Sequence, residues 1–298
     1  GDSVDLASMK LLKAAYDAAE DKNVIASPLG VLTLLSLYAA GAEGPVRDEL
    51  VAALGATDYR QVRIYKKLHN TMDPSYLALA NKIFVHNRNE LTFCATPVPF
   101  NASNTEEKDF HVDSKTTVKK PMMKLKQSVF YIASEDLGAK IIELPYQETH
   151  FRMVVILPNE VGGLSAVLEK VQQKGILTDT FNLNPARQEV EIEFPKFEIK
   201  NRLDLKKLLP KVKVSKIFEE PAGGILDVPV KVGKAFQEAV VKVDEEGATA
   251  TAFTGFVIDG YSSLPQQEPT PIVFKADHPF LFAILHQDIV LFTGAFTH

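Results

Sequence analysis

A run of five very small residues near the C-terminal end constrains this chain more than any other feature. It occupies Ala248–Ala252 and follows an apolar, β-branched segment at Ala239–Val243, an acidic pair and Gly247. Alternate residues of a strand face the same side, so an extended run here offers only small side chains to a neighbouring sheet. Gly247 gives the backbone free rotation just before the run. The pattern is typical of a segment that is exposed in one state and enters a sheet in another.

Five further landmarks accompany this run in a fixed order along the chain. They are Asn23–Pro28, Asn81–Phe84, Lys120–Met123, Phe274–Phe280 and Phe292–Gly294. Together with the small-residue run they resemble the serpins, a family of serine protease inhibitors whose reactive-site loop inserts as a strand. The resemblance implies an α+β fold. It predicts a single domain over residues 1–298, with helices packed on three mostly antiparallel or mixed β-sheets and an exposed reactive-site loop at about residues 245–271.

The predicted elements agree with this class, because helices come first and strands follow. Ser27 and Pro28 are a typical cap and first residue of a helix. The sequence predicts helices over Leu6–Ala19, Leu29–Ala40, Pro45–Leu54, Asp58–Met72, Leu164–Gln173 and Leu203–Leu209. It predicts strands at Asn23–Ala26, Ser75–His86, Phe110–Val112, Thr116–Lys124, Val129–Ser134, Lys140–Pro145, Arg152–Leu157, Glu189–Ile199, within Val228–Val243 and from Ile272 onward. Pro195 indicates an edge or a bend within its strand.

One segment of the family is missing from this chain. In serpins the strand that ends near Asn89 is followed by two helices, two strands of the main sheet and a tryptophan segment. Here residues 91–98 join the two ends directly, Leu91–Asn101 shows no period, and the chain contains no tryptophan. The resemblance therefore implies that the strand beside which the loop inserts is absent. Gly30 and Gln237 stand where the family often has Ser and His, so the polar cluster that closes the sheet cannot form in its usual way.

The resemblance also assigns the functional residues. It places the hinge of the loop at Glu245, Glu246, Gly247, Ala248, Ala250, Ala252 and Thr254. Counting along the loop as in most serpins places the bait bond between Tyr261 and Ser262. Counting backwards from Phe280 reaches Leu264 or Gln266 instead. A tyrosine before the cut bond favours a chymotrypsin-like protease as the partner.

The implied function is inhibition of a protease by a single-use substrate. The protease cuts the bait bond and forms an acyl-enzyme, and the cut loop then inserts into the main sheet before the acyl-enzyme can be hydrolysed. Such a protein is not an enzyme and needs no cofactor. Two alternatives stay open: a non-inhibitory or truncated serpin that acts as a binding or storage protein or as a protease substrate, and a cross-class inhibitor of papain-like cysteine proteases.

Composition and the absence of motifs argue against several other classes. The net charge of −5 argues against a nucleic-acid-binding protein, which would be basic. The single cysteine, Cys94, excludes an intrachain disulfide, and the histidines show no metal-ligand spacing. No apolar run reaches the length of a membrane span, and no nucleotide-binding or hydrolase motif is present. We expect a secreted protein whose signal peptide has been removed, with an intracellular location as the alternative.

Two predicted surface features are a glycosylation site and a basic helix face. Asn101–Ser103 fits the N-glycosylation sequon, which predicts a surface loop and a modification site at Asn101. Arg60, Arg63 and Lys67 share one face of a predicted helix and suggest a weak site for sulfated polysaccharide, although an ordinary solvated face is the commoner explanation. We expect a monomer, with strand exchange between chains as the alternative because an unpaired sheet edge invites pairing.

Overall fold

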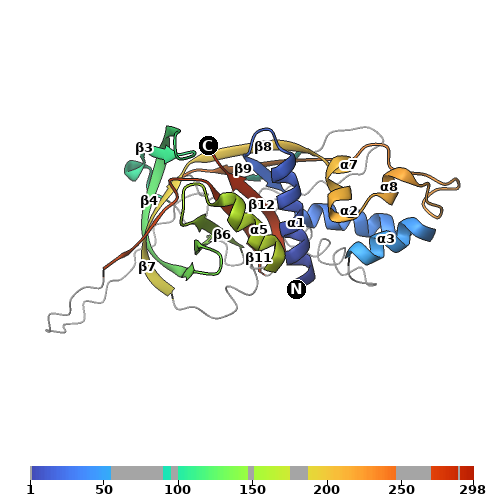
Figure 1. Cartoon of the computed structure of the whole chain (residues 1–298), viewed down its shortest axis with the longest axis horizontal. Helices are drawn as coiled ribbons and strands as arrows, with labels where there is room; N and C mark the ends of the chain where they lie inside the picture. Colours follow the sequence, from blue (N-terminus) through green and yellow to red (C-terminus); the bar gives the residue numbers. More distant parts are fainter. Residues whose placement is uncertain are drawn as a thin grey trace.

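Helices and strands of the chain are arranged in layers (Figure 1). The computed structural model describes residues 2–54, 90–94, 100–146, 151–174, 187–245, 270–287 and 289–298. The helices are α1 (Asp2–Ala18), α2 (Pro28–Gly41), α3 (Gly44–Leu54), η1 (Ala102–Asn104), α5 (Leu164–Lys174), α7 (Leu205–Leu208), η2 (Leu209–Val212) and α8 (Lys216–Glu219). The strands are β1 (Val24–Ala26), β2 (Glu90–Cys94), β3 (Glu106–His111), β4 (Thr117–Ser134), β5 (Ala139–Pro145), β6 (Phe151–Pro158), β7 (Arg187–Pro195), β8 (Phe197–Asp204), β9 (Phe236–Val243), β10 (Ile272–Lys275), β11 (Phe280–His286) and β12 (Ile289–Phe296).

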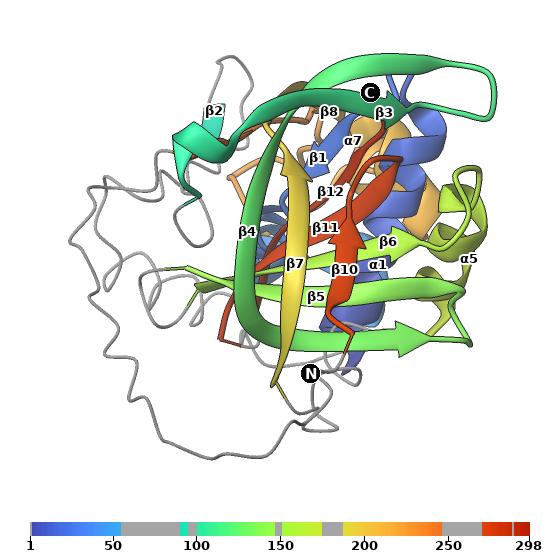
Figure 2. The ribbon, with the colours of Figure 1, turned by 90° about the vertical axis from the view of Figure 1, so that its left-hand side faces the viewer.

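These strands form two hydrogen-bonded sheets in the described part of the chain, where three were predicted. The larger sheet has nine strands in the order β1-β12-β11-β6-β5-β4-β7-β10, with β3 paired to β4. The smaller sheet has the order β2-β9-β8. The expected third sheet is not separate because β4 is a single strand of 18 residues. Its first part pairs with β3 and β7 and its last part with β5, so it curves from one group of strands to the other (Figure 2).

The centre of the larger sheet is buried on both faces. Along β6, Met153 and Val155 pack into the cluster shared with the smaller sheet, whereas Val154 and Ile156 face α1 and α5. Strand β11 alternates in the same way, which follows from the two-residue period of a strand. A strand covered on both sides reads as a continuous apolar run, as these two do. Helices α1 and α5 therefore form one layer, and the smaller sheet forms the opposite layer.

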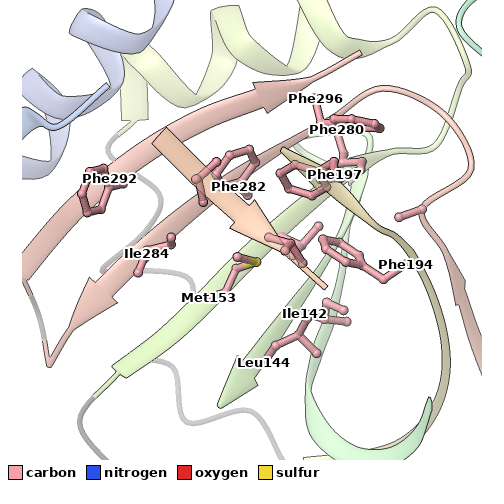
Figure 3. Close-up of a cluster of buried hydrophobic side chains, with 14 of the residues drawn as sticks. Ile142, Leu144, Met153, Phe194, Phe197, Phe280, Phe282, Ile284, Phe292 and Phe296 are labelled. Atoms are coloured by element: carbon pink, nitrogen blue, oxygen red, sulfur yellow. The ribbon is translucent and has the colours of Figure 1, made fainter. Parts of the chain in front are cut away.

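Phenylalanines fill the space between the two sheets (Figure 3). Phe197 of β8 stacks on Phe296 of β12 with ring centroids 4.7 Å apart, and Phe194 lies 5.2 Å from Phe280. Gly294 allows this packing, because a Cβ there would lie 2.2 Å from Cζ of Phe282. This close approach gives a physical reason for the glycine in the landmark at the end of β12.

Helix α2 crosses from this core to a second cluster of apolar residues. Its predicted start is confirmed: Ser27 is the N-cap, its side-chain oxygen accepts a hydrogen bond from the backbone N–H of Gly30, and Pro28 begins the helix. The helix is apolar on all sides, and most of its residues are buried against α3, η2 and α8. Consequently α2 fixes the position of β1, which precedes it directly, relative to the smaller sheet.

Candidate functional site

The predicted reactive-site loop is held by a strand at each end. The described chain stops at Glu245, just after β9, and resumes at Thr270, just before β10. The bait bond Tyr261–Ser262 lies outside the described residues, as do the other predicted hinge positions. These positions are Glu246, Gly247, Ala248, Ala250, Ala252 and Thr254. The part of the site that can be described therefore consists of the two anchoring strands and their contacts.

Strand β9 precedes the predicted hinge and lies in the middle of the smaller sheet. It runs antiparallel to β8 and parallel to β2. The pairing with β2 covers five positions, from Glu90 opposite Glu238 to Cys94 opposite Lys242. A segment that turned back after β9 would run antiparallel to both β9 and β2. If β2 and β9 separated, a returning strand between them could therefore pair with β2 on one side and with β9 on the other.

Strand β2 corrects the prediction for the shortened segment. Leu91–Asn101 was expected to lack regular structure, and the place beside β9 was expected to lack its strand. Instead Glu90–Cys94 forms β2 and pairs directly with β9. The prediction was wrong because the alternation of polar and apolar residues over Glu90–Phe93 is too short to stand out, whereas the edge of β9 can pair with even a short segment. The predicted helix Asp58–Met72 and strand Ser75–His86 lie outside the described residues.

Glu245 secures the end of β9 through its side chain. Its carboxylate forms an ion pair with Lys196 (Nζ to Oε2, 2.5 Å) and accepts a hydrogen bond from the hydroxyl of Thr105 (2.6 Å). The Glu245 side chain is only 9% exposed. Burial raises the pKa of Glu245, but the hydrogen bonds and the charge of Lys196 together lower it by more. The pKa of Glu245 therefore lies below its usual value, and the carboxylate is ionised at neutral pH. The first predicted hinge residue is therefore fixed in place.

A buried histidine fixes the turn that follows β10, the other anchor. Strand β10 lies parallel to β7 at the edge of the larger sheet, and the chain then passes through Asp277 and His278 into β11. One ring nitrogen of His278 lies 2.9 Å from the Asp277 carboxylate, and the other lies 2.6 Å from the backbone carbonyl of Pro158. Both neighbours are acceptors, so both nitrogens carry a proton when both bonds form. The backbone N–H of His111 also donates to the Asp277 carbonyl (2.7 Å).

Two side-chain amides join the smaller sheet to β1. The Gln237 amide of β9 accepts from the backbone N–H of Ser27 (2.7 Å) and donates to its carbonyl (3.0 Å). Asn201 of β8 binds Ile25 in the same two-point manner, at 2.6 and 2.8 Å. The polar cluster was predicted to be unable to form in its usual way, and the described residues contain this pair of amides instead. Sequence reasoning missed Asn201, because its partner lies 176 positions away along the chain.

The remaining predicted features differ in how far the structure describes them. Asn101 is exposed and begins the short helix η1, where its side-chain oxygen accepts from both the N–H and the hydroxyl of Ser103. The predicted polyanion residues Arg60, Arg63 and Lys67 lie outside the described residues. Within the described ranges, no group of three or more His, Cys, Asp or Glu side chains could hold a metal ion. None of the helices that the structure describes is both long and apolar enough to cross a membrane.

Comparison with known proteins gives serpins among both sequences and structures. Antichymotrypsin-2 of Bombyx mori is 30% identical over 249 residues, which are 83% of this chain and 65% of that protein. Iripin-2 of Ixodes ricinus is 31% identical over 78% of this chain and 56% of its own length. The chain thus spans less than two thirds of the length of these curated relatives. Two solved structures share the fold: Serpin48 of Tenebrio molitor (TM-score 0.77, 22% identity, 99% and 97% of the two chains) and a tumour-suppressing serpin (TM-score 0.81, 19% identity, 100% and 98%).

The family comparison covers almost every residue. The sequence profile of the family described as "Serpin (serine protease inhibitor)" matches residues 3–96 and 89–298. The match is divided in two at the junction where the sequence predicted a missing segment. The α+β fold of helices on mixed sheets agrees with the same family. This chain therefore belongs to the serpin family.

Proposed function

We propose that this protein inhibits a chymotrypsin-like serine protease by presenting a bait loop and trapping the acyl-enzyme. The observation that carries the proposal is the pairing of β9, the strand that precedes the predicted hinge. Strands β9 and β2 are parallel neighbours in the smaller sheet, and the small-residue run begins at Ala248, five positions after the end of β9. A reversal of the chain at the hinge would therefore be enough to bring the loop back between β9 and β2.

The catalytic groups of the protease cleave the bait bond, and the loop of the inhibitor then traps the acyl-enzyme. The protease serine attacks the carbonyl carbon of Tyr261, the bond to the Ser262 nitrogen breaks, and the new amine leaves with a proton from the protease histidine. The acyl-enzyme remains joined to the loop. Insertion of the loop then moves the protease away from its reactive geometry, and water cannot complete the hydrolysis once the oxyanion hole is distorted.

Insertion would replace a parallel strand pairing by antiparallel pairings, which are slightly more stable. In the uncut protein β2 and β9 share a parallel ladder. An inserted loop would replace it by two antiparallel ladders, which are slightly more stable for each residue paired. Ala248, Ala250 and Ala252 would face the apolar layer beneath the sheet, where small side chains fit without displacing their neighbours. The released free energy would drive the trap.

Incubation with chymotrypsin tests the proposal. We expect a covalent complex that survives denaturing electrophoresis and a released C-terminal peptide that begins at Ser262. The variant Tyr261→Arg should lose the complex with chymotrypsin and form one with trypsin, because the residue before the cut bond fills the specificity pocket. Papain, tested in parallel, examines the cross-class alternative. A peptide that begins outside residues 260–267 would contradict the assignment of the bait bond.

A second function, as a binding or storage protein or a cut substrate, is favoured by the length of β2. Within the described residues this strand has five residues, and a loop inserted beside them could pair with β2 over a short distance only. The chymotrypsin experiment separates the two functions. An inhibitor gives the covalent complex, whereas a substrate gives cleavage at the same bond with fully active protease.

We also propose an extracellular setting for this activity. An exposed sequon supports it, since Asn101 lies at the surface and its amide nitrogen is not the atom that Ser103 contacts. Protein expressed in a eukaryotic secretory system should lose mass on treatment with an N-glycosidase, and Asn101→Gln should abolish that loss. The polysaccharide site at Arg60, Arg63 and Lys67 stays a prediction, testable by whether heparin accelerates complex formation.

A further inference from the structure

A pocket is lined by residues of α1, α2, α3 and η2 and by none of β9 or β10 among those described. Helices α1, α2 and α3 are labelled in Figure 1. Its volume of about 390 Å³ falls in the range of about 300–1,000 Å³ that is usual for small-molecule sites. Apolar side chains of all four elements form most of its lining, among them Leu11, Val31, Leu35, Leu54 and Val212. The pocket thus offers an apolar body a place out of water.

Charged groups at the pocket are mostly positive. Lys10 of α1 and Lys213, which follows η2, both line it, and both are exposed. Neither lysine forms an ion pair with another residue of the described chain. Glu49 is the one acidic lining residue among those described, and a single oxygen of its carboxylate already accepts from the backbone N–H groups of Ser215 and Lys216 (2.6 and 2.9 Å).

We propose that this pocket binds a small amphipathic organic anion, such as a medium-chain carboxylate. The apolar chain would lie against α2 and η2, and the carboxylate would face Lys10 and Lys213 at the mouth. An anion suits the site for two reasons. In the described part of the chain the two lysines form no ion pair, and the one carboxylate already accepts hydrogen bonds from two N–H groups. An apolar lining with a few charged groups is the usual composition of a ligand site. Neither protease inhibition nor the bait loop is needed for this binding.

Calorimetric titration of the full chain with three ten-carbon probes tests the proposal. We expect decanoate to bind saturably with one molecule per chain, decanol to bind more weakly, and decylamine to bind most weakly. Equal affinity for decanoate and decylamine would overturn the charge assignment. No saturable binding of decanoate up to its solubility limit would overturn the site itself.

Two pairs of variants assign the binding to this pocket. Ala53→Phe places a large side chain at the exposed mouth and should abolish binding, whereas Ala18→Phe, at an exposed alanine outside the lining, should leave it unchanged. The double variant Lys10→Gln/Lys213→Gln should weaken decanoate about tenfold, the loss expected for hydrogen bonds to a charged group, and leave decanol unchanged. The control Lys206→Gln/Lys211→Gln changes exposed lysines outside the lining.

Two results with these variants would overturn the proposal. Unchanged decanoate binding by Ala53→Phe, with native circular dichroism, would place the ligand elsewhere and overturn the proposal. An equal loss in the Lys206→Gln/Lys211→Gln control would reduce the effect to net charge and would also overturn it.

Discussion

The amides of Asn201 and Gln237 take the place of a neighbouring strand beside β1. Strand β1 pairs with β12 on one edge. On its other edge, the N–H and C=O of Ile25 and Ser27 meet these two side chains instead of a backbone. Gln237 is 6% exposed, so the backbone groups that it binds are shielded from water.

Loss of the Gln237 amide should therefore destabilise the fold. Gln237→Ala leaves two shielded backbone groups of Ser27 without this partner, and we expect the free energy of unfolding to fall by about 1–3 kcal/mol. Urea unfolding followed by circular dichroism measures it. The control Gln188→Ala removes an exposed amide of β7 and should change the free energy by no more than about 0.5 kcal/mol. An equal fall in the free energy of unfolding in both variants would show that the two hydrogen bonds with Ser27 add no stability beyond that of an exposed amide.

His278 gives the second anchor a predictable dependence on pH. Burial lowers the pKa of His278, but the hydrogen bonds with Asp277 and the Pro158 carbonyl, and the Asp277 charge, raise the pKa by more, although Lys140 opposes them. The folded-state pKa therefore lies above the usual 6.5. Its stabilising contribution is complete below that value and is lost as pH rises through the raised pKa. Burial raises the pKa of Asp277, but its bond with His278 lowers it below 3.8, so this group loses its contribution only in acid.

The expected result is a fall in stability as pH rises from about 6 through the His278 titration. The midpoint of urea unfolding should decline in the wild type and stay nearly constant in His278→Gln over the same range. His111→Gln serves as the control, because this histidine interacts electrostatically with Asp277 but is more exposed. A wild-type midpoint that does not change with pH would contradict the proposed protonation of His278.

At the scale of elements, the sequence predicts best those parts that carry a local signal. Helix α2 has a capping serine, a proline at its first position and an apolar run, and its predicted start is confirmed. The predicted antiparallel pairing of β5 with β6 is confirmed as well, since most residues of both strands are apolar and buried. The break at Pro195 separates β7 from β8, which belong to different sheets.

The elements that the sequence does not predict depend on contacts between distant segments. Strand β2 exists through backbone bonds to β9, about 150 positions later. Only Glu90–Phe93 alternate polar and apolar residues, the shortest run that indicates a strand. The single long strand β4 was predicted as two strands, because the polar residues Lys126–Ser128 interrupt the apolar pattern. Long-range pairing with β3, β5 and β7 holds β4 together over its whole length. The candidate site has the same limits: the hinge follows from its residue types, whereas its anchors Lys196 and Thr105 do not.

The hinge itself can be tested through the alternation of its two faces. If the cut loop inserts between β2 and β9, Ala250 faces the apolar layer and Thr249 faces solvent. Ala250→Arg should then be cleaved by chymotrypsin as fast as wild type but form no covalent complex, because an arginine would be buried without a partner. Thr249→Arg is the matched control and should form the complex normally. Equal yields of complex from the two variants would exclude insertion through this face.

At the scale of the whole molecule, the length of β2 bears on how strongly the proposed insertion could be driven. Within the described residues, the strand beside β9 has five residues. Each residue pair of the inserted loop contributes to the driving force, so a short β2 yields less free energy than a full-length neighbour would. A slower insertion lets the protease hydrolyse more of the acyl-enzyme before it is trapped, since both outcomes start from the same intermediate.

We therefore expect this chain to be an inefficient trap. Several molecules should be consumed for each protease molecule inhibited, with the rest recovered as cleaved protein. Insertion should still stabilise the cleaved product, so its Tm should exceed that of the uncut protein by a modest amount, as a small gain in free energy predicts for a domain of this size. Titration of chymotrypsin activity measures the first quantity and calorimetry of purified cleaved protein the second. One inhibitor consumed per protease, together with a large rise in Tm on cleavage, would mean that the ladder beside β2 extends well beyond Cys94 once the loop has entered the sheet.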